Sequence, residues 1–186
     1  MIKYNKINLI KNIDSNNLNS TISIKLTHLG LSLDEKLCEK NFLKLVEVAK
    51  KHNTGITIDM ENSTYTTKTL ELFQKGLLMY EGVGAVIQAY LHRSSDDLIM
   101  LDSSKLNLRI CKGIYNEPPE IAIQDRFAIN NNFLKLVETI FNGKGYACLA
   151  THDLELINQL EELITKNKIS KDRFEFQVLY LSLIHI

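Results

Sequence analysis

Polar side chains suited to catalysis or ligand binding follow short apolar runs at several places in this chain of 186 residues. The runs are rich in residues that favour strands, and they cover residues 21–25, 55–59, 84–88, 107–112, 146–152 and 174–180. In a parallel (β/α) barrel the carboxyl ends of the strands converge on one face, where the active site lies. We therefore expect one pocket lined by the polar residues of those ends, namely Lys25, Asp59, Gln88, Arg109, Lys112, Thr151, His152 and Tyr180.

The cations of this set indicate an anionic or electron-rich ligand. Arg109 offers a planar fork of donors and Lys112 adds a second cation, while Gly113 lets the backbone approach a ligand closely. Lys25 carries a compact point charge that suits a carboxylate or a phosphate. The structural alternative is that these bases are solvated or salt-bridged, with Lys25 extending to solvent.

Two further strand ends carry groups with chemistry. Asp59 ends a strand that is expected to be buried, where an unpaired carboxylate would be costly. It either accepts hydrogen bonds from a neighbouring loop or takes part in the reaction. Thr151 and His152 leave another strand where the next helix begins, and Asp153 is placed to cap that helix. A helix N-terminus favours negative charge, such as a phosphate.

Two other chemistries use the same residue types. Metal-ligand side chains occur at His92, His152, Asp59 and Asp153. No short ligand spacing joins them, so we predict no metal site. A Schiff-base lyase, which needs a lysine at a strand end, stays open with Lys25 or Lys112 as the nucleophile.

Bulk composition favours one ordinary domain over residues 1–186. The chain is 45% hydrophobic and 24% charged with a formal net charge of zero, which gives no reason to expect a nucleic-acid partner. The three cysteines are far apart, which is typical of reduced thiols in a cytoplasmic protein. No run reaches the ~18 apolar residues of a membrane span. A complete (β/α)8 barrel needs roughly 200 to 250 residues, so about six βα units fit here.

Most of the segments between the runs have helical periodicity, which predicts α/β architecture with a parallel sheet. We expect helices within the first 19 residues, over 35–51, from 63 or 64 onward, after 94 or 95, around 127–141 and over 154–166. Ser32 or Asp34 would cap the second of these and Ser94 or Ser95 the fourth. The inner face predicted for the helix over 35–51 consists of Leu37, Phe42, Leu45, Val46 and Ala49.

Six motifs give the sequence a family resemblance. SIKLTHLG, ITIDMEN, VIQAYL, LRICKGIY, ATHD and FEFQVLY stand in the order and spacing of bacterial proline dehydrogenases, the flavin enzymes of proline catabolism. The sequence resembles this family over residues 21–180. The resemblance implies a distorted (βα)8 barrel that holds FAD and oxidises L-proline to 1-pyrroline-5-carboxylate by hydride transfer to flavin N5. It also implies a quinone acceptor and a cytoplasmic enzyme in peripheral contact with the inner face of the cell membrane.

The resemblance further implies roles for individual residues. Asp59, Tyr115 and Arg109 would be catalytic, with Arg109 near the reactive edge of the isoalloxazine. Lys25 would help bind the proline carboxylate, and Leu179 would lie near the proline or flavin ring. The implied cofactor contacts are Gln88, Arg109, Ile110, Cys111, Lys112, Gly113, Thr151, His152 and Gln177.

The match has departures at both ends of the chain. After FQVLY the family continues with Gly and Arg, whereas this chain reads LSLIHI over residues 181–186. We therefore expect a fragment that lacks the first strand and the last strand and helix, with a tail foreign to the family. The absent helix would bring a pair of arginines and a tyrosine to the substrate. An inactive truncated barrel is accordingly an alternative.

Overall fold

The structure is a computed structural model that describes residues 2–101 and 106–179. Tyr180 and the tail over 181–186 lie outside the described residues. The chain divides into two compact units, residues 1–86 and 87–186, which are described in turn. That the whole chain forms a single domain stays a prediction.

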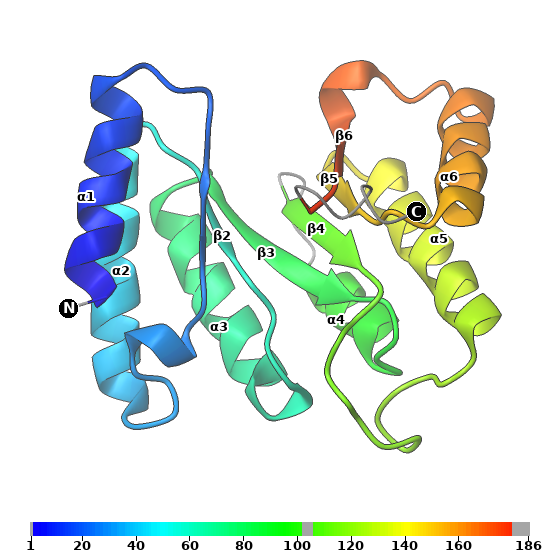
Figure 1. Ribbon diagram of the computed structural model, residues 1–186, viewed down its shortest axis with the longest axis horizontal. Helices are drawn as coiled ribbons and strands as arrows, with labels where there is room; N and C mark the ends of the chain where they lie inside the picture. Colours follow the sequence, from blue (N-terminus) through cyan, green and yellow to red (C-terminus); the bar gives the residue numbers. More distant parts are fainter. Residues whose placement is uncertain (1, 102–105, 180–186) are drawn as a thin grey trace. The chain divides into compact units, whose positions relative to one another are not determined.

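The first unit consists of βα units in chain order (Figure 1). Its elements are α1 (Ile2–Ser15), β1 (Ile22–Ile24), α2 (Glu35–Lys51), β2 (Ile56–Ile58), α3 (Ser63–Met79) and β3 (Val83–Gln88), the last of which runs into the second unit. The strands are parallel in the order β1-β2-β3, and Ile24 pairs with Ile58, which pairs with Ala85. Lys25 and Asp59 thus follow directly on paired residues.

Helix α2 has the predicted bounds and is capped by Asp34, whose carboxylate accepts from the backbone N–H groups of Lys36 and Leu37. One residue of its predicted inner face is wrong. Leu37 is 46% exposed, whereas Cys38 is fully buried and lies four residues before Phe42 on the face that packs inward. The buried face of α2 therefore begins at Cys38, one residue later than the predicted Leu37.

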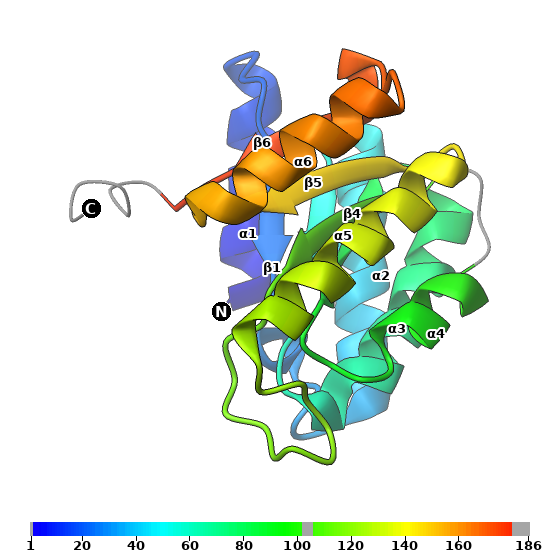
Figure 2. The same ribbon diagram turned by 90° about the vertical axis from the view of Figure 1, so that its right-hand side faces the viewer.

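The second unit repeats the pattern. Its elements are α4 (Ser94–Met100), β4 (Asn107–Cys111), α5 (Arg126–Asn142), β5 (Tyr146–Ala150), α6 (Leu154–Lys166) and β6 (Phe174–Gln177). Strands β4, β5 and β6 are parallel neighbours, with Arg109 paired to Cys148 and Cys148 to Glu175. Helix α5 packs on β4 and β5 and beside α6, as Figure 2 shows.

Most strands are shorter than predicted, whereas β3 begins one residue earlier than predicted and ends at Gln88 as predicted. The run over 146–152 ends at Ala150, and Thr151 instead accepts the backbone N–H of Asp153 through its hydroxyl. The serine cap predicted for α4 is wrong as well. Arg93 occupies the cap position, where it makes no capping hydrogen bond, and its guanidinium instead donates to the Asp97 carboxylate. The Ser94 hydroxyl donates to the backbone oxygen of Leu91 at 2.8 Å.

The predicted α/β class with parallel strands is confirmed. Among the described residues, no helix combines the length and the apolar character that crossing a bilayer requires.

Candidate functional site

Arg109 is held by the neighbouring strands of the second unit. Its Nε donates to Oε1 of Gln177 on β6 at 2.5 Å, and Nε2 of Gln177 donates to Oε1 of Glu175. Because register partners in a parallel sheet point to the same face, Arg109, Cys148 and Glu175 form one row across β4, β5 and β6. Ile110 points to the opposite face of β4 and is fully buried, so it shares no face with Arg109.

The thiol in this row is not an activated nucleophile. Burial, reinforced by the negative charge of Glu175, raises the pKa of Cys148 to about 12. Its Sγ lies 3.5 Å from Oδ1 of Asn107. Cys148 is therefore a neutral thiol at physiological pH, and reactivity that depends on a thiolate is absent there.

Gln88 supplies a buried acceptor beside the end of β4. It ends β3 with 3% exposure, and within the described part of the chain its Oε1 has no hydrogen-bond partner. The segment that follows it is bonded to β4, since the N–H of Ala89 donates to the oxygen of Cys111 and that of Tyr90 to the oxygen of Lys112. An unsatisfied buried oxygen is costly, so Gln88 is suited to a ligand that brings an N–H or O–H donor.

Position 113 requires glycine, both because of its backbone conformation and because of the neighbouring Tyr90 ring. Its φ is +113°, and a Cβ built on it would lie 2.2 Å from Cδ1 of Tyr90. The close approach expected at Gly113 is therefore made, in this structure, by the Tyr90 ring.

Asp153 lies at the centre of a charged cluster. Its Oδ2 accepts from Lys112 Nζ at 2.5 Å, from Arg126 Nη2 at 2.9 Å and from Asn130 Nδ2 at 3.4 Å. The side chain of Asp153 is only 9% exposed. The hydrogen bond from Lys112, with those from Arg126 and Asn130, holds the pKa of Asp153 well below its usual range. The carboxylate is thus ionised and shared between two cations.

The same residue organises the start of α6. Oδ1 of Asp153 accepts the N–H of Glu155 at 3.1 Å, which confirms the predicted cap. Its own N–H donates to Oγ1 of Thr151, which is buried, whereas His152 beside it is exposed. One residue therefore joins the end of β4, the end of β5 and the beginnings of two helices.

The first unit contains a second polar cluster, in which sequence reasoning found Lys25 and Asp59 and missed Thr27 and Glu61. Lys25 and Asp59 are both half-buried, and the N–H of Asp59 donates to the oxygen of Ile24 at 2.8 Å. Two residues further along the chain from Lys25 and Asp59, beyond both strands, Glu61 accepts from the N–H of Thr27 at 3.0 Å and from its hydroxyl at 2.6 Å. Glu61 is 7% exposed. Its position two residues after Asp59 was the available signal.

Two other predicted residues lie outside the strands. Tyr115 is half-buried in the connection between β4 and α5. Leu179 lies beyond the end of β6 and is 76% exposed.

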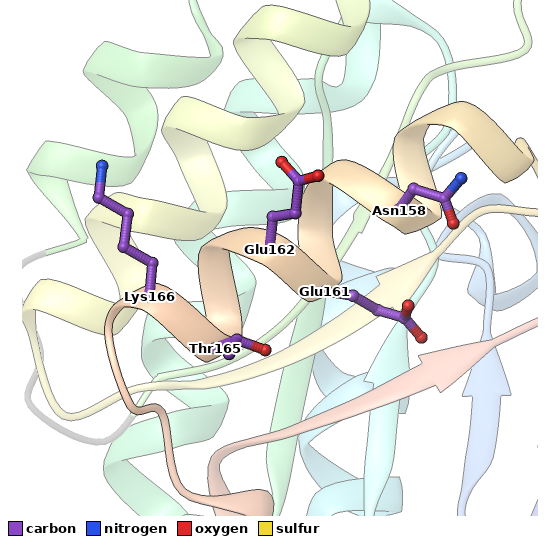
Figure 3. A pocket seen from close by; sticks show the side chains of 5 residues that line it. All are labelled: Asn158, Glu161, Glu162, Thr165 and Lys166. Carbon is purple, nitrogen blue, oxygen red and sulfur yellow. The ribbon is translucent and has the colours of Figure 1, made fainter.

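An open surface hollow of about 580 Å³ lies along α6 (Figure 3). It is lined by Asn158, Glu161, Glu162, Thr165 and Lys166. All five side chains come from one helix, and none belongs to the predicted site. Among the described residues there is no group of three or more His, Cys, Asp or Glu side chains able to hold a metal ion.

Comparison with known proteins gives the clusters a family context. The family model described as Proline dehydrogenase matches residues 3–180. The chain belongs to the proline dehydrogenase family. It is 38% identical over 174 residues to Proline dehydrogenase 2 of Bacillus subtilis strain 168, a match that covers 94% of this chain and 57% of that protein. It is 35% identical to Proline dehydrogenase of Deinococcus radiodurans, covering 94% of this chain and 58% of that protein. This family member therefore spans a little over half the length of the curated relatives it matches.

Solved structures share the fold of this proline dehydrogenase homologue. Proline utilization A from Bdellovibrio bacteriovorus matches with a TM-score of 0.83 at 18% identity, over 96% of this chain and 24% of that one. Proline utilization A from Bradyrhizobium japonicum, as a D779Y mutant, matches with a TM-score of 0.81 at 20% identity, over 95% and 22%. The predicted incomplete barrel of α/β class is confirmed by these matches, and so is the family resemblance.

Proposed function

We propose that this chain carries the FAD site and part of the proline site of a proline dehydrogenase. The single observation that supports this most is the family match over residues 3–180. The oxidation of L-proline to 1-pyrroline-5-carboxylate is then the reaction of the complete enzyme.

The polar groups of the second unit fit a flavin nucleotide. An isoalloxazine ring offers an N–H donor, which suits Oε1 of Gln88, an atom with no hydrogen-bond partner among the described residues. The ring also offers carbonyl acceptors, which suit the guanidinium of Arg109. The diphosphate is anionic, which suits the cations around Asp153 and the N-terminus of α6. Cys111, Gly113, Thr151 and His152 are the remaining proposed contacts, and Ile110 would contribute through its main chain.

The flavin, when bound, supplies the hydride acceptor N5 for the ring carbon next to the proline nitrogen. The protein orients and polarises the reactants. Gln177 holds the Arg109 guanidinium, whose positive charge favours the electron-rich reduced ring. Lys25 supplies part of the positive charge that binds the proline carboxylate. Asp59 follows β2 next to Lys25, since the two residues come directly after a pair of register partners. Tyr115 and Leu179 are proposed contacts of the reacting rings.

The electrons would then pass to a quinone. A membrane-embedded acceptor requires peripheral contact between a cytoplasmic enzyme and the inner face of the cell membrane. These finer points rest on the family resemblance.

Two other functions give different observable results. In a Schiff-base lyase, borohydride would trap a carbonyl substrate on a lysine, and no flavin would bind. Against this, Lys112 is engaged by Asp153 at 2.5 Å, so its nitrogen is not presented as a nucleophile. An inactive truncated barrel would show neither flavin binding nor turnover.

The deciding experiment is the visible spectrum of the purified chain with and without added FAD, after removal of free cofactor. We expect retained flavin absorbance that is bleached when L-proline is added without oxygen. Proline-dependent reduction of an artificial electron acceptor gives the matching turnover assay. A chain that retains no flavin contradicts the proposal for this polypeptide. If a full-length form binds flavin but does not turn over proline, the proposed reaction is contradicted for the complete enzyme.

A further inference from the structure

The cluster around Asp153 has more structure than a helix cap needs. A cap requires one oxygen to accept one or two backbone N–H groups, and Oδ1 of Asp153 does this with Glu155. Asp34, which caps α2, accepts only the backbone N–H groups of Lys36 and Leu37. At Asp153 a second oxygen, Oδ2, receives three side-chain donors in addition.

The burial of this cluster is graded. Asp153 is 9% exposed, Lys112 27% and Arg126 68%. The pair of Asp153 with Lys112 is therefore the shielded one, and Arg126 closes it from the solvent side. Because water competes less with a shielded ion pair, the bond from Asp153 restrains the Lys112 side chain most.

Lys112 needs such a restraint to bind a ligand well. A lysine side chain has four rotatable bonds, and ordering it costs conformational entropy. An ammonium held by a neighbouring carboxylate has lost that freedom before a ligand arrives. Preorganisation of this kind raises affinity without adding a contact.

We propose that Asp153 is a positioning residue of the cofactor site, which holds Lys112 at the end of β4 in the orientation that binds FAD. The inference rests on the proposed function, since it concerns the same cofactor. It adds a residue that the family resemblance did not assign to the site, and it makes Arg126 an outer support of that residue.

Charge alone gives the opposite expectation, which makes the proposal testable. If Asp153 only neutralised Lys112, removing its charge would expose a cation and strengthen the binding of an anionic dinucleotide. If Asp153 positions Lys112, removing its charge frees the side chain and weakens binding.

The experiment is a titration of the whole chain with FAD, followed by quenching of flavin fluorescence, for the wild type and the D153N variant. Asparagine is as good a helix cap as aspartate, so D153N keeps α6 capped while removing the charged acceptor. We expect the dissociation constant to rise about tenfold, the effect of weakening hydrogen bonds to a charged group. The D34A variant removes a helix cap in the first unit and lowers stability without touching Lys112, so it should change the dissociation constant for FAD by less than about twofold.

A double-mutant cycle tests whether Asp153 acts through Lys112. In a K112M background, D153N should have no further effect on the dissociation constant, because no ammonium is left to position. Equal or tighter FAD binding by D153N, or full additivity with K112M, overturns the inference and leaves the proposed function intact. Failure of the wild-type chain to bind FAD is a separate result, which overturns the proposed function and the inference together.

Discussion

Replacing Thr27 by valine should loosen the two strand ends that carry Lys25 and Asp59. Valine has the shape of threonine without the hydroxyl, so T27V removes one hydrogen bond, from Thr27 Oγ1 to Glu61 Oε1 at 2.6 Å. The backbone N–H of Thr27 still donates to Oε2 of Glu61. The variant therefore isolates a single contact between the segment after β1 and the segment after β2.

The magnitude follows from the burial of the acceptor. A hydrogen bond to a charged group contributes about 1.5 to 3 kcal/mol, and an acceptor left unsatisfied retains its desolvation cost. Glu61 is 7% exposed, so water replaces the lost donor poorly. Thr27 itself is half-buried, which moves the expectation toward the lower half of the range. We expect T27V to lower the free energy of unfolding of the first unit by about 2 kcal/mol.

Urea unfolding followed by far-ultraviolet circular dichroism measures this loss by linear extrapolation. The T27S variant keeps the hydroxyl and is the matched control, which should lose less than half as much. The E61Q variant keeps an acceptor of the same shape without the charge, and combining it with T27V gives the coupling energy of the pair. If T27V and T27S have the same stability, the hydroxyl contributes nothing and the reasoning is refuted.

A functional readout separates positioning from stability. In the flavin-loaded enzyme, T27V should raise the KM for proline, because Lys25 lies two residues before Thr27 and Asp59 two residues before Glu61. The affinity for FAD should stay within about twofold, since its proposed contacts lie in the second unit. Parallel losses of proline and FAD binding would instead indicate general unfolding.

Three further predictions concern the second unit. Arg109→Ala should weaken FAD binding or slow flavin reduction by proline, and unchanged flavin content with an unchanged reduction rate would discard its role. Gly113→Ala should destabilise the unit by about 2 kcal/mol or more, because φ is +113° and the new Cβ meets the Tyr90 ring. Gly143→Ala, at a φ of −86°, is the neutral control for thermal unfolding. Because the folded-state pKa of Asp153 is lowered, its stabilising effect is present above its ordinary pKa of 3.8 and is lost as pH falls below it. The difference in unfolding free energy between wild type and D153N should therefore shrink in acid, and a difference that grows would contradict this sign.

The helices were the most predictable part of the fold. The bounds of α2 and α6 agree with the predictions because each has an aspartate at its start and a long apolar stripe. The positions of the strands were predicted, but their exact bounds were not. A strand ends where its backbone groups stop pairing with the neighbouring strand, and the sequence does not show where that happens. At Thr151 the competing partner is a backbone N–H two residues away, a contact that periodicity does not report.

The candidate site was predictable as positions and not as contacts. The sequence placed Arg109 at a strand end, whereas the structure places it in the middle of β4 and adds that Gln177 holds it. Strand alternation also puts the side chains of Ile110 and Arg109 on opposite faces of β4. Assigning both side chains to one ligand because they belong to the same family motif overlooks this difference. Glu61 and the full role of Asp153 were missed because both depend on partners 34 and 41 residues away in sequence.

Two carboxylates in this chain hold other residues in place, and this bears on how acidic groups near a candidate site should be interpreted. Glu61 and Asp153 are both largely buried, and each uses its oxygens to bind donors from a different strand end. Asp153 is a poor general base, because taking up a proton would break the hydrogen bonds that hold its pKa well below its usual range. Glu61 has both oxygens occupied by donors from Thr27. Burial and proximity to the site would otherwise nominate both as catalytic acids or bases. The contacts show instead that each carboxylate binds groups just after a strand end of its own unit, which leaves Asp59 as the carboxylate proposed to take part in the reaction.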